Sequence, residues 1–184
     1  TGSNFTKTNF SYSDLSNSNF ARANLSGANC KHAIFKESNF RGANFSETNF
    51  TGADLTGSNL TNHIETISGS GSRRATIVTA NIEKTILDKC NLSGLTLDGW
   101  ICDALSLDGA IFDRSKLFKA SFIYSSLNAA TFQYCDVRST NFTNATLNEV
   151  KFVGADLSGA NFQNAAIKKV DFTRAQLPRF DFSE

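Results

Sequence analysis

Four aspartates spaced five residues apart form the densest group of chemically active side chains in this sequence of 184 residues. They are Asp98, Asp103, Asp108 and Asp113, and no Lys or Arg occurs between Lys89 and Arg114. Carboxylates without neighbouring cations steer the approach of a positively charged partner. The sequence therefore predicts an acidic belt that contacts a basic protein partner, unless these carboxylates are only solvated corners of the fold.

Other groups with chemical potential are sparse. The chain has two histidines, His32 and His63, and four cysteines, none of them in a cluster with metal-ligand spacing. No nucleophile and base can be paired from these residues. We therefore predict no enzymatic activity, no cofactor and no metal site.

Charge and length exclude further classes of protein. Lys and Arg number 18 against 17 Asp and Glu, a formal charge of +1, which favours neither a nucleic-acid binder nor a uniformly acidic protein. No apolar run approaches the length of a membrane span. The chain has no Met, so we interpret Thr1 as a boundary inside a longer product. We expect a soluble cytoplasmic domain of bacterial origin, although export as an effector stays open.

The acidic belt lies within a repeat with a period of five. An apolar residue recurs at every fifth position from Phe5 to Leu60, and again from Ile77 to Phe182. We call these apolar residues centres. The residue two places before a centre is usually small, and the residue just before it is often Asn or Asp, as in the segment Ala23–Gly27, which reads Ala-Asn-Leu-Ser-Gly.

A period of five fits neither an α-helix nor an isolated strand. One large and one small inward residue per unit instead describe a short segment that turns a corner at the end of each unit. The pattern resembles the pentapeptide-repeat family and covers nearly the whole chain. The resemblance implies an all-β fold, a right-handed quadrilateral β-helix with four repeats per coil, here about 8.5 coils with one projecting loop.

The repeat is interrupted once. Leu60 and Ile77 are separated by one normal step of five plus an insertion of twelve. We therefore predict coils over residues 1–60, an inserted Gly/Ser-rich loop over 61–76, and coils over 77–184, all in one continuous domain. Arg73 and Arg74 lie at the end of this loop and are candidate partner contacts.

Three large residues stand in consecutive repeats where a small one is expected. They are Leu95, Trp100 and Leu105, and Trp100 is the only Trp in the chain. Either these side chains widen the interior of one coil, or they reach the surface between the aspartates and form an apolar patch with an acidic rim. The second arrangement predicts that Trp100 contacts the partner.

The sequence ends in register at a pair of aromatic residues. Phe180 and Phe182 would leave the last coil uncapped, and an uncapped edge of β-structure invites pairing. We therefore predict a possible homodimer through the C-terminal coil.

Three interpretations of the function remain open from the sequence. The first is a rigid scaffold for protein–protein interaction, because a solenoid offers long polar faces and no catalytic residues can be assigned. The second is implied by the resemblance: a DNA mimic that binds a type II topoisomerase, as quinolone-resistance members of the family do. A third reading is a bacterial effector domain that binds a host protein. The confinement of acidic residues mainly to one belt weighs against the DNA mimic.

Overall fold

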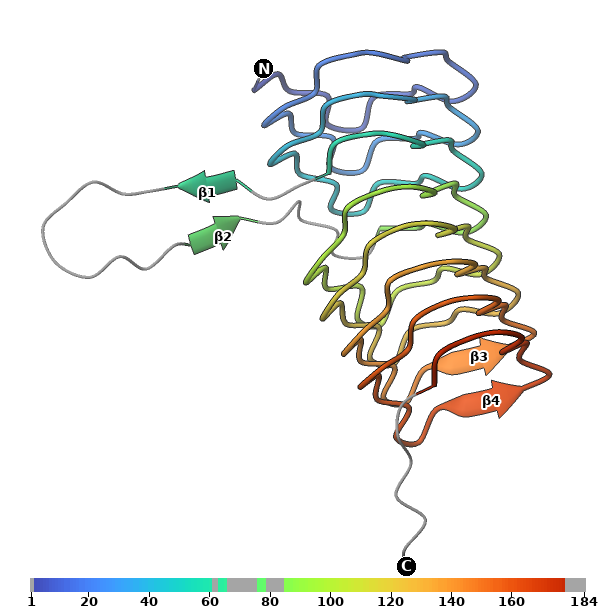
Figure 1. Cartoon of the computed structure of the whole chain (residues 1–184). Helices are drawn as coiled ribbons and strands as arrows, with labels where there is room; N and C mark the ends of the chain where they lie inside the picture. The colour runs from blue at the N-terminus through green and yellow to red at the C-terminus, as the bar shows by residue number, and fades with distance from the viewer. Residues whose placement is uncertain (1, 61–62, 66–75, 79–84, 178–184) are drawn as a thin grey trace, which may run out of the picture.

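The computed structural model describes residues 2–60, 63–65, 76–78 and 85–177, and among them the chain winds into stacked coils without a helix (Figure 1). Extended structure in this part is limited to very short pieces. The named strands are β1 (His63–Glu65), β2 (Thr76–Val78), β3 (Thr146–Asn148) and β4 (Ala166–Lys168).

Neighbouring coils pair in parallel with a constant register. β3 pairs with β4 so that Thr146 lies opposite Ala166, and single bridges with the same offset run through the rest of the stack, as in Asn4↔Asn24. This offset equals four units of the five-residue repeat, so each coil has four sides. The predicted coil length is therefore confirmed.

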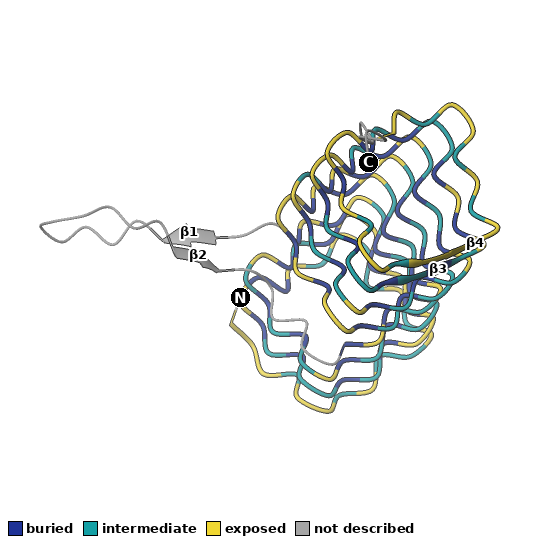
Figure 2. Cartoon of the chain, turned by 90° about the horizontal axis from the view of Figure 1, so that it is seen from below, coloured by how far each residue is buried: buried dark blue, intermediate teal, exposed yellow. Residues whose placement is uncertain are grey.

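The centres fill the interior because each side of a coil turns its apolar residue inward (Figure 2). In the second half, phenylalanines of successive coils stack with nearly parallel rings, 4.7 Å apart for Phe112 and Phe132 and 5.3 Å for Phe122 and Phe142. Phe122 and Phe132 are fully buried, as predicted. The centres Ile167 and Leu177 are about half exposed, because no described coil covers them.

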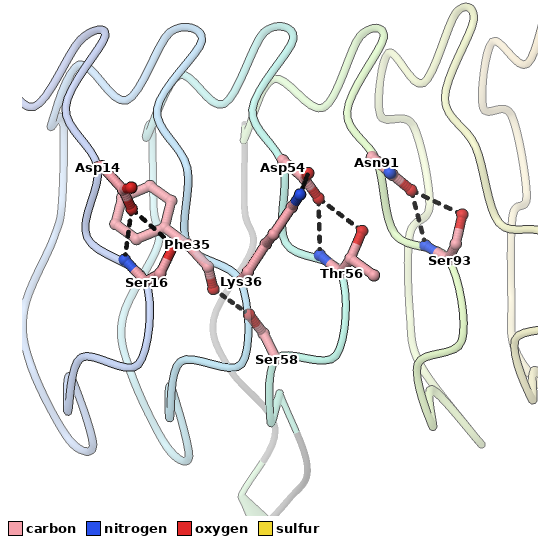
Figure 3. A network of polar contacts seen from close by, with 9 residues as sticks. All are labelled: Asp14, Ser16, Phe35, Lys36, Asp54, Thr56, Ser58, Asn91 and Ser93. Atoms are coloured by element: carbon pink, nitrogen blue, oxygen red, sulfur yellow. Dashed lines mark hydrogen bonds and ion pairs between the residues drawn. The ribbon is translucent and has the colours of Figure 1, made fainter.

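Most small polar residues in the interior donate a hydrogen bond to a carbonyl of the preceding coil, and Ser125 donates instead to Phe122 in its own turn. The hydroxyl of Ser58 donates to the carbonyl of Phe35 at 2.6 Å (Figure 3), and the hydroxyl of Thr140 donates to that of Leu117 at 2.8 Å. A buried hydroxyl without an acceptor would destabilise the fold. The repeat can therefore alternate Ala, Ser and Thr at this position without loss of packing.

The corners are turns with a left-handed second residue. In the first turn the amide of Thr8 donates to the carbonyl of Phe5 at 3.0 Å, with Lys7 at φ 57°. The side chain at this left-handed position lies over the equivalent corner of the next coil, where the residue beneath it is often glycine. At Gly154 an added Cβ would lie 2.7 Å from the ring of Tyr134, whereas at Gly94 it would meet nothing within 4 Å.

Between Leu60 and Thr85 an arm formed by β1 and β2 projects from the stack (Figure 1). The two strands pair antiparallel, with Ile64 opposite Ile77. Across the base of the arm Asn49 bridges Ile86, whereas Asn29 bridges Asn49 with the normal offset of four repeats. The predicted restart of the repeat at Ile77 is therefore wrong, because Ile77 belongs to the arm and the five-residue spacing there is coincidental.

Candidate protein-binding surface

The four aspartates of the belt lie at the four successive corners of one coil. Asp98, Asp103, Asp108 and Asp113 each follow a buried centre and open a turn. Their backbone position is therefore the one that the repeat predicted.

Each of these carboxylates caps a turn of the next coil. Their Oδ1 atoms accept backbone N–H groups of the following coil at 2.9 Å. The donors are, in order, Phe118, Ile123, Asn128 and Gln133. Asp88 does the same for the amide of Asp108 at 3.0 Å. The belt thus has a structural task that the sequence analysis missed.

The reason for this task lies in the sequence of the coil that is capped. In many other repeats the residue before a centre is Asn or Asp, and its Oδ1 accepts the amide two residues later, as Asp14 does from Ser16, Asp54 from Thr56 and Asn91 from Ser93 (Figure 3). In the coil that follows the belt, the residues just before the four centres are instead Lys116, Ser121, Ser126 and Thr131. These residues supply no such cap to their own turns, so the aspartates of the preceding coil supply the missing acceptor.

Trp100 does not reach the surface. It is 3% exposed, and its neighbours in the predicted patch, Leu95 and Leu105, are buried as well. These side chains occupy the inward position of the repeat, in the coil that follows the insertion, and their bulk fills the interior there. The Trp100 Nε1–H has no hydrogen-bond partner among the described residues. The prediction that Trp100 contacts a partner from the surface is therefore wrong.

A different set of residues, on the belt coil and on the coil that follows it, forms an apolar and acidic surface. Ile101, just before a centre, is 59% exposed and lies on the side of the stack that continues through Ser121 and Asn141. Tyr124, at the following corner one coil later, is 68% exposed. We call the five residues Asp98, Ile101, Asp103, Ile123 and Tyr124 the Ile101 patch.

Asp103 joins the two halves of the Ile101 patch. Its Oδ1 accepts the Ser121 hydroxyl at 2.5 Å and the Ile123 amide at 2.9 Å. Ser121 bridges Ile101, and Tyr124 follows Ile123 in the chain. The exposed Asp103 carboxylate is therefore fixed against the turn that carries Ile123 and Tyr124, and no ion pair to it is found in the described part of the chain.

The other aspartates of the belt are less available. Asp108 and Asp113 engage both oxygens, since their Oδ2 atoms accept from the amide side chains of Asn128 and Gln133. Near Asp98, the ring of Phe118 lies beneath Lys119 and Arg138, 5.1 and 5.5 Å from their charged groups. Asp103 is thus the carboxylate of the belt with the least compensation.

Arg138 itself is held firmly by a carboxylate. Its Nε and Nη2 each donate to Asp136 at 2.7 Å, and this pairing is the main cause that raises the pKa of Arg138, with Asp156 and Asp98 adding to it. The guanidinium therefore stays charged and in place beside Phe118.

Four predicted contacts fall in segments that the structure does not describe. Arg73 and Arg74, proposed for the partner, and Phe180 and Phe182, proposed for the dimer, lie outside the described residues. Their roles stay predictions.

The described part of the chain offers little for catalysis. It contains no group of three or more His, Cys, Asp or Glu residues that could hold a metal ion. All four cysteines are buried, and burial raises the pKa of Cys30 and of Cys135 to about 12, so these thiols are protonated and not nucleophilic. Within the same residues no helix is long and apolar enough to cross a membrane.

Comparisons with known sequences agree with the repeat. A family model described as pentapeptide repeats matches eight copies over residues 1–22 and 23–62, and one described as a pentapeptide repeat region matches residues 105–182. No curated protein sequence matches the chain.

Solved structures give similar results. The chain is 30% identical to a pentapeptide repeat protein from the Arabidopsis thaliana thylakoid lumen, with a TM-score of 0.49 over 52% of this chain and 69% of that one. It is 22% identical to HetL, a pentapeptide repeat protein involved in heterocyst differentiation regulation from Nostoc sp. strain PCC 7120, with a TM-score of 0.29 over 98% of this chain and 87% of that one. It is 16% identical to QnrB1, a plasmid-mediated fluoroquinolone resistance protein, with a TM-score of 0.45 over 92% of this chain and 84% of that one.

Proposed function

The chain belongs to the pentapeptide-repeat family, whose fold is a right-handed quadrilateral β-helix, and on that premise we propose that it is a non-enzymatic rigid scaffold that binds a protein partner at the acidic belt. The observation that carries the proposal is the charge of one coil: four carboxylates at its corners, with no Lys or Arg between Lys89 and Arg114. Such a concentration attracts a basic surface and orients it before contact.

Rigidity supports the scaffold role. Adjacent coils share backbone hydrogen bonds on every side, stacked rings in the interior and the carboxylate caps at the corners. A partner docking on this surface would lose little entropy from the scaffold itself, because the contact residues are held in place beforehand.

The alternative of a DNA mimic has weaker support. A mimic needs a continuous acidic stripe, but among the described residues stacked carboxylates occur only in short columns. Asp88 and Asp108 are followed along the stack by Asn128, and Asp136 and Asp156 are followed by Gln176. The formal charge of +1 points the same way.

Affinity capture with charge variants tests the proposal. The immobilised protein is compared with a variant carrying Asn in place of Asp98, Asp103, Asp108 and Asp113, which keeps the Oδ1 acceptors and removes four charges. The matched control is Asp14→Asn with Asp171→Asn, because both residues cap their own turns as Asn does elsewhere. We expect one protein to be lost from the belt variant and retained by the control, and equal recovery by all three baits would refute the proposal.

Self-association through the C-terminal coil is a separate proposal. Ile167 and Leu177 in the last described coil are about half exposed, so a second copy stacked there would bury them. Light scattering should then show a species near twice 20.0 kDa that Phe180→Asp weakens. A strict monomer at high protein concentration would contradict it.

A further inference from the structure

We propose that the partner docks on the Ile101 patch, and that the docking segment is an extended stretch of protein in which an apolar side chain is flanked by Lys or Arg. This inference rests on the proposed function and narrows it from a whole coil to one of its four sides. It also replaces Trp100, which is buried, by the residues that face outward.

The fold does not require an isoleucine at position 101. At the equivalent position on the same side of the stack, the following coils carry Ser121, Asn141 and Asn161, and Asn141 caps its own turn by accepting the Thr143 amide at 3.0 Å. Ile101 gives up that cap and leaves 59% of its surface in water. Ile34 and Ile86, at the same repeat position on other sides, are 38% exposed.

Tyr124 makes the same argument at the corner. Its backbone is left-handed with φ 59°, a conformation that disfavours side chains with a Cβ by about 1 kcal/mol. The next coil along the stack has Asn144 at this corner, with φ 58°, and Asn tolerates the conformation better. A tyrosine that is 68% exposed in this position offers a large flat contact surface.

Charge complementarity selects the occupant. The carboxylate of Asp103 is fixed by the Ser121 hydroxyl and the Ile123 amide, where the coil of Ile101 meets the coil of Tyr124, and only its Oδ1 is engaged by described residues. A basic side chain of the partner can pair with the remaining oxygen, while a neighbouring apolar side chain covers Ile101 and Tyr124. The phosphates of a nucleic acid would instead meet these carboxylates with like charge.

Synthetic peptides test the pairing directly. The probe is a short peptide with the centre Lys-Leu-Lys in a Gly/Ser background, and the matched peptides of equal length carry Lys-Ser-Lys or Glu-Leu-Glu. Amide chemical shifts of the isotope-labelled full chain report where each peptide binds. We expect the Lys-Leu-Lys peptide to shift the amides of Ile101, Asp103, Ile123 and Tyr124, with an affinity about tenfold above that of either matched peptide.

Three variants remove the patch while preserving the fold. Ile101→Asn and Tyr124→Asn introduce the residues found in equivalent positions at Asn141 and Asn144, and Asp103→Asn keeps the Oδ1 acceptor. Each should weaken Lys-Leu-Lys binding about fivefold or more. The control Ile86→Asn makes the same change on another side and should leave binding unchanged.

Several outcomes would overturn the inference. Absence of shifts at millimolar Lys-Leu-Lys peptide, equal binding of the Lys-Ser-Lys peptide, or an equal loss in Ile86→Asn would each do so. If the captured partner is lost from the fourfold belt variant but kept by Ile101→Asn and Tyr124→Asn, the proposed function stands and the Ile101 patch fails. If the belt variant keeps the partner, the proposed function itself fails.

Discussion

The coils on either side of the β1–β2 arm satisfy the same backbone N–H group in different ways. Before the arm, most turns are capped by their own repeat, as when Asn9 accepts the amide of Ser11 at 3.0 Å. After the arm, the turns of the coil from residue 114 to 133 are capped by aspartates of the preceding coil, as when Asp103 accepts the amide of Ile123. Own-turn capping returns further along, where Asn141 accepts the amide of Thr143.

This difference teaches that the cap of an equivalent turn amide can come from its own repeat or from a neighbouring coil. A local cap keeps each repeat independent, because cap and amide are two positions apart. A cap from the neighbouring coil couples two coils and frees the residue before the centre to be something other than Asn or Asp. The residues just before the centres of the coil from residue 114 to 133, among them Lys116 and Ser121, have this freedom.

The largest expected effect comes from the interior beside the arm. Trp100→Ala should lower the free energy of unfolding by about 3–5 kcal/mol, because the buried indole leaves a cavity that the neighbouring coils cannot close. Urea denaturation measures the change. A loss below about 1 kcal/mol would show that the indole does not fill the interior, since a large-to-small change in a packed core costs more than that.

A contrast between corner glycines comes next. Gly154→Ala should destabilise the fold by about 2 kcal/mol, because it combines a strained left-handed alanine with displacement of the Tyr134 ring. Gly94→Ala, near the arm, meets no neighbour and should cost only about 1 kcal/mol for the backbone strain. Equal losses in thermal or urea denaturation would mean that the aromatic contact at the corner contributes nothing.

The two kinds of cap can be separated by a pair of alanine variants. Asp103→Ala leaves the Ile123 amide and the Ser121 hydroxyl without their acceptor and should cost about 1–2 kcal/mol. Asn9→Ala, on an exposed turn of the first part, should cost about 0.5–1 kcal/mol.

Hydrogen exchange then sharpens the result of this pair. In Asp103→Ala the backbone amide of Ile123, one coil away, should exchange faster, whereas in Asn9→Ala the backbone amide that loses its acceptor is that of Ser11 in the same repeat, and the only bond lost to the next coil is the one from the Asn29 side chain. The comparison between the regions breaks down if the Ile123 amide keeps its protection.

The smallest effect concerns the aspartates that cap their own turns. Burial alone would raise the pKa of Asp54, but the hydrogen bonds from Thr56 and the charge of Lys36, 3.3 Å away, outweigh it and lower the pKa below its ordinary value of 3.8 (Figure 3). Because the folded pKa is below the unfolded one, the stabilisation is present above about pH 4 and is lost as the pH falls through the folded value. Asp54→Asn should keep the cap and reduce the loss of stability between about pH 5 and about pH 2.5. An unchanged pH profile would contradict the assignment.

The repeat made most of the fold predictable. One buried centre in each unit of five requires a corner after each unit, so the burial of Phe122 and Phe132 followed from spacing alone. The four-sided coil came from the resemblance, and the constant offset between bridged residues confirms it. Local spacing works here because every repeat meets the same environment.

Features that depend on neighbouring coils were harder to predict. Ile77 falls in register by chance, and only the pairing of β1 with β2 reveals that it belongs to the arm. Trp100 is too large for a small-residue position in a regular coil, so its burial depends on the interior beside the insertion.

The sequence does contain a signal for the caps that the belt aspartates provide. Ser121 occupies a position where many repeats have Asn or Asp, and Asp103 lies next to it in the preceding coil. Aligning the sequence in rows of four repeats would have paired the missing cap with its replacement. The exposure of Ile101 follows from its position just before a centre, which faces outward throughout the repeat.

The constant offset between coils bears on which insertions and deletions this gene can accept during evolution. The arm nearly doubles the length of one closed loop, which raises the entropic cost of closure by only about 0.5 kcal/mol, so its length can drift almost freely. A single codon lost inside a coil would instead shift every later centre by one place. Losing the codons of four consecutive repeats would remove one whole coil and leave every later centre on its own side of the stack.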